Sequence, residues 1–187
     1  MGFLSKIWAF ILDIAQTILL AASVFLVIYI FFFRPFQVNG ASMLPSFEDK
    51  EYVLTNIFIL HFENPKVGDV VVFKSPTEPD KDFIKRVIAI PGDTISLRSG
   101  EVYINSQKLD QSEYVPNYVQ TSEGSFLAEG ESITVPNDSY FVMGDNRLHS
   151  SDSRQWGFVK KSEIIGKSLF VYWPLNRMRL VKNPYQK

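Results

Sequence analysis

The stretch "IAQTILLAASVFLVIYIFFF", residues 14–33, decides the organisation of this chain because it contains no charged residue. A helix of this length spans about 30 Å, which is the thickness of the hydrocarbon core of a bilayer. The run is apolar on every side, whereas a helix packed into a soluble core carries a single apolar stripe. The sequence therefore predicts a transmembrane helix over about residues 14–33, within an N-terminal membrane anchor over residues 1–35.

The same run is too long for a cleavable secretory signal, whose apolar region has roughly 7 to 15 residues. The small residues that follow it, Val38 and Gly40, also make a poor cleavage site. We therefore expect the anchor to stay attached. The charges do not orient it, because Lys6 and the amino terminus precede the run and Arg34 follows it.

Beyond residue 35 the chain changes to short runs rich in β-branched and aromatic residues, separated by turns such as "NPKVGD" and "VPND". Spacings of this kind are typical of antiparallel sheets folded on themselves. The sequence predicts a mostly β domain over residues 36–187, with one helical turn around "KKSEIIG", residues 160–166. The predicted strands lie within residues 51–60, 69–73, 82–90, 94–97, 101–104, 132–135, 139–143 and 168–173.

Composition excludes several classes of function. Nineteen basic residues balance twenty acidic ones, and no Lys/Arg cluster is long enough to neutralise a row of phosphates, so nucleic acid is not an expected partner. Cysteine is absent, which removes disulfides and thiol nucleophiles and suits an oxidising compartment. The two histidines, His61 and His149, lie in no metal-binding spacing. We therefore expect neither a metal nor a cofactor.

Two residues could form a catalytic pair. Ser42 stands in "VNGASMLPSF", residues 38–47, among small residues that permit close approach of another chain. Lys85 lies in the predicted strand "DFIKRVIAI", where alternation places it on a face with the apolar residues Phe83, Val87 and Ala89. Such a lysine can extend to water from a sheet edge. Alternatively, burial lowers its pKa below the usual value of about 10.4 and makes the neutral amine a general base for a serine.

A Ser/His/Asp triad from Ser42, His149 and Asp152 is a third interpretation. His149 lies in a polar turn, where most histidines are simply solvated, so the sequence favours lysine as the base.

Four segments, in order, resemble the bacterial type I signal peptidases, membrane-anchored serine proteases that remove signal peptides from exported proteins. They are "SMLPSF" (42–47), "GDVVVF" (68–73), "KRVIAIPGD" (85–93) and "GDNRLHSSDSRQWG" (144–157). Each is weak alone, but the four in order are specific. With the anchor, the resemblance covers most of the chain.

The resemblance implies a role for each matching position. Ser42 matches the nucleophile and Lys85 its general base, with Phe83 and Met143 as part of the apolar wall that buries the amine. Ser150 matches a hydroxyl that orients this amine.

Further supporting roles follow from the last segment. Asp152 and Arg154 match a salt bridge, and Asp145 is expected to shape the turn together with Asn146 and Arg147.

Gly40, Ser42 and Met43 match the segment that binds the substrate and the oxyanion. Some family members carry at position 40 a serine whose hydroxyl holds the oxyanion, whereas Gram-positive members often have glycine. The oxyanion would then be held by the Ser42 backbone N–H and a second donor that the sequence does not identify.

The resemblance further implies that preprotein signal peptides and the lipid bilayer are the partners, and it leaves proximity to the secretion translocon open. It implies a single-pass protein of the cell membrane with a short cytoplasmic N-terminus and an extracytoplasmic catalytic domain. The apolar residues of "TNIFILHF", 55–62, either dip into the membrane interface or belong to the core.

Two other functions remain open. A membrane-anchored, non-catalytic signal-peptide-binding or accessory protein would share the fold, although such a protein has no need for both Ser42 and Lys85. Another Ser/Lys hydrolase, such as a self-cleaving repressor, would need a DNA-binding module that the sequence does not contain.

Overall fold

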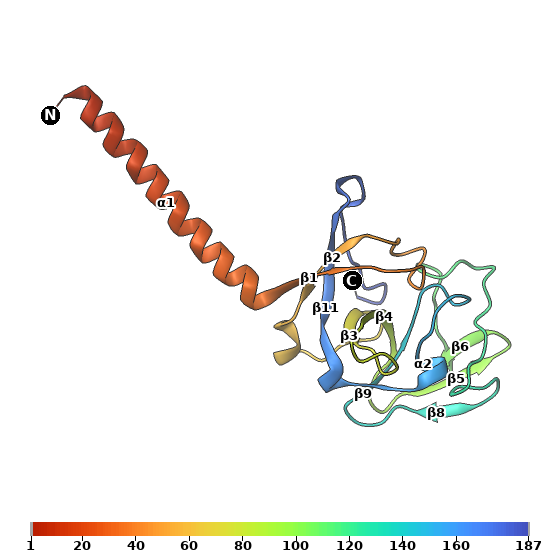
Figure 1. Cartoon of the computed structure of the whole chain (residues 1–187). Helices are drawn as coiled ribbons and strands as arrows, with labels where there is room; N and C mark the ends of the chain where they lie inside the picture. Colours follow the sequence, from red (N-terminus) through yellow and green to blue (C-terminus); the bar gives the residue numbers. More distant parts are fainter. Residues whose placement is uncertain (1, 187) are drawn as a thin grey trace.

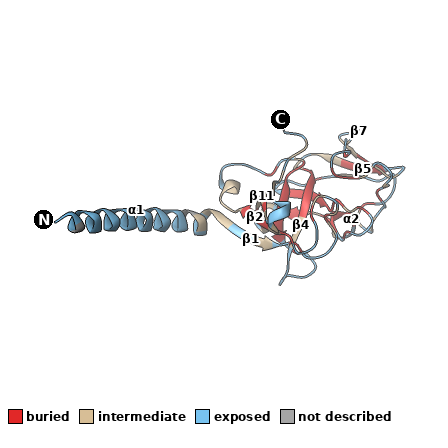
Figure 2. Ribbon diagram, turned by 90° about the horizontal axis from the view of Figure 1, so that it is seen from above, coloured by how far each residue is buried: buried red, intermediate tan, exposed pale blue. Residues whose placement is uncertain are grey.

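The computed structural model describes residues 2–186 and consists of one long helix that projects from a β domain (Figure 1). Helix α1 covers Phe3–Phe32 and is followed directly by strand β1, Phe33–Gln37. Its segment Ser5–Phe32 is long and apolar enough to cross a membrane, and the most apolar 18-residue window within it contains no buried residue. Figure 2 shows α1 exposed over most of its length, with intermediate burial at Tyr29 and Phe32, where it meets the domain. The helix begins earlier than residue 14 because charged side chains on an exposed helix do not interrupt its backbone hydrogen bonds.

The larger sheet contains eight strands, and every strand pairing in it is antiparallel. Its order is β1-β2-β11-β3-β4-β9-β10, with β12 paired to β11. The strands after β1 are β2 (Tyr52–Asn56), β3 (Val70–Lys74), β4 (Asp82–Ala89), β9 (Ser139–Met143), β10 (Val159–Lys160), β11 (Ile164–Trp173) and β12 (Arg179–Leu180).

A second, four-stranded antiparallel sheet has the order β7-β6-β5-β8. Its strands are β5 (Thr94–Arg98), β6 (Glu101–Ile104), β7 (Gln107–Lys108) and β8 (Ser132–Thr134). The remaining elements are short: the helix α2 (Ser153–Trp156) and the 3₁₀ turns η1 (Ile59–His61), η2 (Lys161–Glu163) and η3 (Leu175–Arg177). The predicted mostly β, antiparallel fold behind an apolar N-terminal helix is confirmed, and η2 lies inside the predicted helical turn.

Three buried clusters form the core. The first joins the two sheets, with Phe141 and Met143 of β9 against Ile95 and Leu97 of β5. The second lies around Phe73 of β3 and Val87 of β4. The third packs the loop after β1 onto the larger sheet and contains Val38, Met43, Phe47, Val53, Val70 and Val171. The loop that carries Ser42 is thus anchored in the core on the side away from solvent.

Strand β4 departs from the predicted alternation near its end. The pairing with β9 shifts between Val87 and Ala89, which is a β-bulge. Ala89 therefore packs in the first cluster, whereas Val87 packs in the second. The predicted shared face holds from Phe83 to Val87 and fails at Ala89, because one extra residue in a strand reverses every later side chain.

Candidate active site

The loop after β1 presents Ser42 on a fixed backbone. Met43 is fully buried in the third cluster, so its side chain positions the loop and does not line the cleft. Asn146 holds the other side of the loop, since its backbone N–H donates to the Ser42 carbonyl at 3.1 Å and its Nδ2 donates to the Ala41 carbonyl at 3.0 Å. Ser42 therefore lies between a core anchor and a neighbouring turn.

Lys85 of β4 reaches the Ser42 hydroxyl. Its side chain is 4% exposed, and Nζ donates to Ser42 Oγ at 2.8 Å and to the Ile84 carbonyl at 3.0 Å. The Phe83 ring centroid lies 5.2 Å from the same nitrogen. Lys85 is thus a buried lysine in direct contact with Ser42. The sequence left open whether Lys85 extends to water or is buried, and in the structure it is buried.

Burial lowers the pKa of Lys85 to about 8, against the opposing effect of the Asp152 and Asp145 charges, which favour the ammonium. A substantial fraction of the amine is therefore neutral at mildly alkaline pH. A neutral amine at 2.8 Å from a hydroxyl can accept its proton and so make the oxygen a nucleophile.

The strand register changes one part of the expected apolar wall. Met143 lies opposite Arg86 and packs in the first cluster, on the face of β4 that Lys85 does not occupy. Val142 lies opposite Val87, which shares the Lys85 face. The expectation that Met143 forms part of the wall around Lys85 is thus wrong, and Val142 lies on that face instead, because adjacent residues of a strand point to opposite faces.

Ser150 is close to the site but does not contact the amine as expected. Its Oγ has no hydrogen-bond partner among the described residues, and Lys85 Nζ donates to Ser42 and Ile84 instead. A Cβ placed on Gly144 would lie 2.2 Å from Ser150 Oγ and 2.4 Å from the Ser42 carbonyl oxygen. Glycine at position 144 therefore leaves room for both the Ser150 side chain and the Ser42 carbonyl.

The predicted salt bridge between Asp152 and Arg154 is present and buried. Arg154 donates Nε–H and Nη2–H to the two carboxylate oxygens, both at 2.8 Å. The Gly144 N–H donates to the same carboxylate at 3.0 Å. Burial raises the pKa of Asp152, but these hydrogen bonds and the Arg154 charge outweigh that effect and hold the pKa below its usual value.

Asp145 does more than shape a turn, because it forms a second buried ion pair. Its carboxylate accepts from Arg86 Nε at 2.8 Å and from Nη2 at 2.7 Å, and both side chains are almost fully buried. Arg86 is the neighbour of Lys85, and Asp145 is the neighbour of Asn146. This pair therefore ties the strand of the lysine to the turn that holds Ser42. Sequence reasoning did not identify Arg86, although its place on an otherwise apolar face, with Ile84 and Ile88, was the available signal.

The backbone N–H groups of Gly40 and Ser42, the two residues matched to the oxyanion-binding segment, differ in their partners. The Gly40 N–H donates to Asp49 Oδ1 at 2.7 Å, in a backbone conformation with a φ of +89° that favours glycine. Among residues 2–186, the Ser42 N–H has no acceptor. Of these two groups, the Ser42 N–H is the one available to an oxyanion.

The histidines stand apart from this arrangement. His149 is exposed, and Asp152 is engaged by Arg154 and Gly144, so Ser42, His149 and Asp152 do not form a triad. His61 lies in η1 and contacts the Phe58 carbonyl at 3.2 Å. Within the described part of the chain, no group of three or more His, Asp or Glu side chains is arranged to hold a metal ion.

A cleft of about 680 Å³ opens beside Ser42 and Lys85. One wall is formed by β1 and the loop after it, which supply Phe36, Gln37 and Asn39, and the other by residues 81–85. Strand β1 is an edge strand, and β4 pairs with β9 only from Arg86 onward, so both walls present backbone groups without a partner strand. An extended peptide can therefore form β-type hydrogen bonds to either wall.

Comparison with known proteins places the chain in one family. The model of the family "Signal peptidase, peptidase S26" matches residues 11–173. Signal peptidase I of Bacillus amyloliquefaciens is 34% identical over 175 residues, which cover 92% of this chain and 93% of that protein. Signal peptidase I S of Bacillus subtilis is 36% identical over 173 residues, covering 90% and 92%. A probable signal peptidase I-1 of Synechocystis is 35% identical over 177 residues, covering 91% and 86%.

Among solved structures, a signal peptidase I of Enterococcus faecalis is 32% identical with a TM-score of 0.47, and the match covers 56% of this chain and 97% of that one. The family assignment rests on the family model and the sequence relatives, each of which spans most of the chain. On these grounds the chain belongs to the bacterial type I signal peptidases, peptidase family S26.

Proposed function

We propose that this protein is a membrane-bound serine endopeptidase that removes signal peptides from exported preproteins, with Ser42 as the nucleophile and Lys85 as the general base. The observation that carries the proposal is the 2.8 Å contact between Lys85 Nζ and Ser42 Oγ, made by a lysine whose pKa is about 8. A non-catalytic accessory protein would gain nothing from burying a lysine against a serine.

The reaction follows from the positions of these groups. Neutral Lys85 takes the hydroxyl proton as Ser42 Oγ adds to the scissile carbonyl carbon. The Ser42 N–H stabilises the oxyanion, and the Lys85 ammonium gives its proton to the leaving amine as the C–N bond breaks. A water, deprotonated by the same amine, then attacks the acyl-enzyme ester and releases Ser42.

The cleft favours an extended substrate. A peptide lying between β1 and residues 82–85 directs alternate side chains toward the same wall, as in any strand. Small residues at positions −1 and −3 would face the enzyme together, which explains a small-x-small requirement. Phe83 and Ile84 line this side of the cleft, so the surface offered to those residues is partly apolar.

The membrane arrangement is part of the proposal. We assign residues 1–35 to a single-pass anchor with a short cytoplasmic N-terminus, although Phe33–Pro35 already pair with β2, and residues 36–187 to the catalytic domain outside the cytoplasm. The Ile57 N–H donates to the carbonyl of Phe32, the last helical residue, at 3.0 Å. The domain is therefore joined to the end of α1 without a free linker, which keeps the cleft near the bilayer where preproteins leave the translocon.

The residues of "TNIFILHF" lie at this junction. Ile57, Phe58, Ile59 and Leu60 are half-buried, and Phe62 is 74% exposed. The segment is therefore neither wholly core nor wholly surface, and Phe62 is the side chain that it offers to the membrane interface.

The test is cleavage of a synthetic preprotein peptide with an Ala-x-Ala site by the full chain in detergent micelles. Ser42→Ala and Lys85→Met should each lower kcat by more than about 1000-fold, because each removes a reacting group. His149→Ala is the control and should cleave as the wild type does. Turnover that survives Ser42→Ala, or that is lost in His149→Ala, would rule out the Ser42/Lys85 assignment.

A further inference from the structure

We propose that a pocket between η1 and η2, which we call the lysine-rimmed pocket, binds the phosphate headgroup of an anionic phospholipid from the surrounding membrane. It is separate from the cleft at Ser42, and it is lined by Ile57, Leu60, His61, Asn137, Asp138, Ser139, Lys160, Lys161, Ser162, Ile164 and Ile165. This inference rests on the proposed membrane anchorage of α1.

The pocket lies directly beside the end of α1. Ile57, one of its walls, donates its N–H to the Phe32 carbonyl at 3.0 Å. The next residue, Phe58, packs its ring edge-on against Phe32 with centroids 4.5 Å apart. A headgroup in the leaflet that α1 leaves would therefore be within reach of the pocket.

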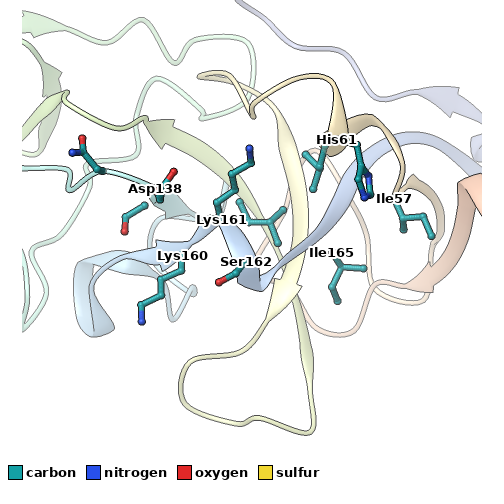
Figure 3. Close-up of a pocket in the computed structure, with 11 residues that line it drawn as sticks. Ile57, His61, Asp138, Lys160, Lys161, Ser162 and Ile165 are labelled. Atoms are coloured by element: carbon teal, nitrogen blue, oxygen red, sulfur yellow. The ribbon is translucent and has the colours of Figure 1, made fainter.

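The lining combines an apolar surface with a charged rim. Ile57 and Leu60 come from the segment around η1, and Ile164 and Ile165 come from the start of β11. Figure 3 shows Lys160, Lys161 and Ser162 between Asp138 at one end and Ile57 at the other. With a volume of about 740 Å³, the pocket is large enough for a headgroup and the first part of an acyl chain.

The charges of the rim favour an anion. The residues that line the pocket include two lysines and one carboxylate, Asp138, so the lining carries a net positive charge. The carboxylate of Glu163 in η2 lies outside the lining and accepts a hydrogen bond from the Lys160 backbone N–H at 3.0 Å. Neither lysine takes part in a salt bridge among the described residues, whereas Lys74, Lys81, Lys108 and Lys167 each do. Two lysines held beside a membrane exit attract an anionic headgroup, while the isoleucines favour a lipid over a soluble phosphate.

The experiment measures lipid retention by native mass spectrometry of the full chain in neutral detergent micelles. Phosphatidylglycerol, phosphatidylcholine and glycerol phosphate are titrated separately. The wild type should retain one phosphatidylglycerol at concentrations about tenfold lower than those needed for phosphatidylcholine. Binding of glycerol phosphate as tight as that of phosphatidylglycerol would contradict a lipid ligand.

Two variants test the pocket itself. Lys160→Ala/Lys161→Ala should weaken phosphatidylglycerol binding by about tenfold. The matched control, Arg98→Ala/Lys108→Ala, removes the same charge from the second sheet and should bind like the wild type.

Ser162→Trp keeps the charge but fills the pocket from an exposed position, so it should also weaken binding. Equal binding by the two double variants, or unchanged binding by Ser162→Trp, would overturn the inference. Peptide cleavage in the same micelles reports separately on the proposed function, because lipid retention requires no turnover.

Discussion

At the scale of single residues, the sequence predicted the pair that defines the candidate site but not its surroundings. Alternation along β4 placed Lys85 among apolar residues, and the structure buries it there. The contact with Ser42 could not be derived from alternation, because it joins two segments that are distant in the chain through the order of the strands. The sequence named Met143 as part of the apolar wall around Lys85, whereas the structure places its neighbour Val142 on that face. Only the pairing register of β9 with β4 distinguishes these two adjacent residues.

The burial of Lys85 predicts a stability cost that depends on pH. Its folded pKa of about 8 lies below its unfolded value of 10.5, so the unfolded state binds more protons between these pH values and stability rises with pH across that window. Below it, the folded state is destabilised by about 3 kcal/mol. Lys85→Met should therefore raise the free energy of unfolding by about 1 to 3 kcal/mol at neutral pH, and by less near pH 10.

Thermal unfolding of the full chain in micelles, at both pH values, measures this difference. Lys81→Met, at an exposed surface lysine paired with Glu78, serves as the control and should change little. A Lys85→Met protein that is less stable than the wild type at neutral pH would argue against a costly buried amine.

At the scale of elements, the strands of three or more residues were predicted except β1, although β11 was predicted only from residue 168, and the two-residue strands were not. Strands β7, β10 and β12 have two residues each, which is too short for a periodic pattern. Strand β1, "FRPFQ", follows the apolar run without a break and was assigned to the anchor and its exit. Helix α2 had a readable signal, because Asp152 is its N-cap and accepts from the Arg154 N–H.

The two buried ion pairs predict how the turn after β9 is held. Asp145→Ala leaves Arg86 buried without its carboxylate, so the free energy of unfolding should fall by about 3 to 5 kcal/mol. Cleavage should fall as well, because the adjacent Asn146 holds the Ser42 loop. Denaturant unfolding of the full chain in micelles measures the change in the free energy of unfolding. Glu63→Ala removes an exposed partner of Lys66, and a loss no larger than in this control would contradict the assigned role.

At the scale of the whole molecule, the sequence predicted an apolar helix followed by a β domain, and the structure contains both. Composition and the spacing of the strand-like runs predict a mostly β domain and nothing more specific. The family follows from the four ordered segments and from the comparisons. The side of the membrane on which the domain lies follows from neither, because Lys6 and Arg34 flank the apolar run and balance each other.

If Lys85 is the general base, the pH dependence of cleavage must follow the loss of its proton. Cleavage of the preprotein peptide by the full chain in micelles should be measured as kcat/KM from about pH 6 to about pH 10, for the wild type and for His149→Ala. Because only the neutral amine accepts the Ser42 proton, we expect both profiles to rise about tenfold per pH unit and to level off above an apparent pKa near 8. A flat profile, or a rise near pH 6.5 that disappears in His149→Ala, would contradict the role of Lys85.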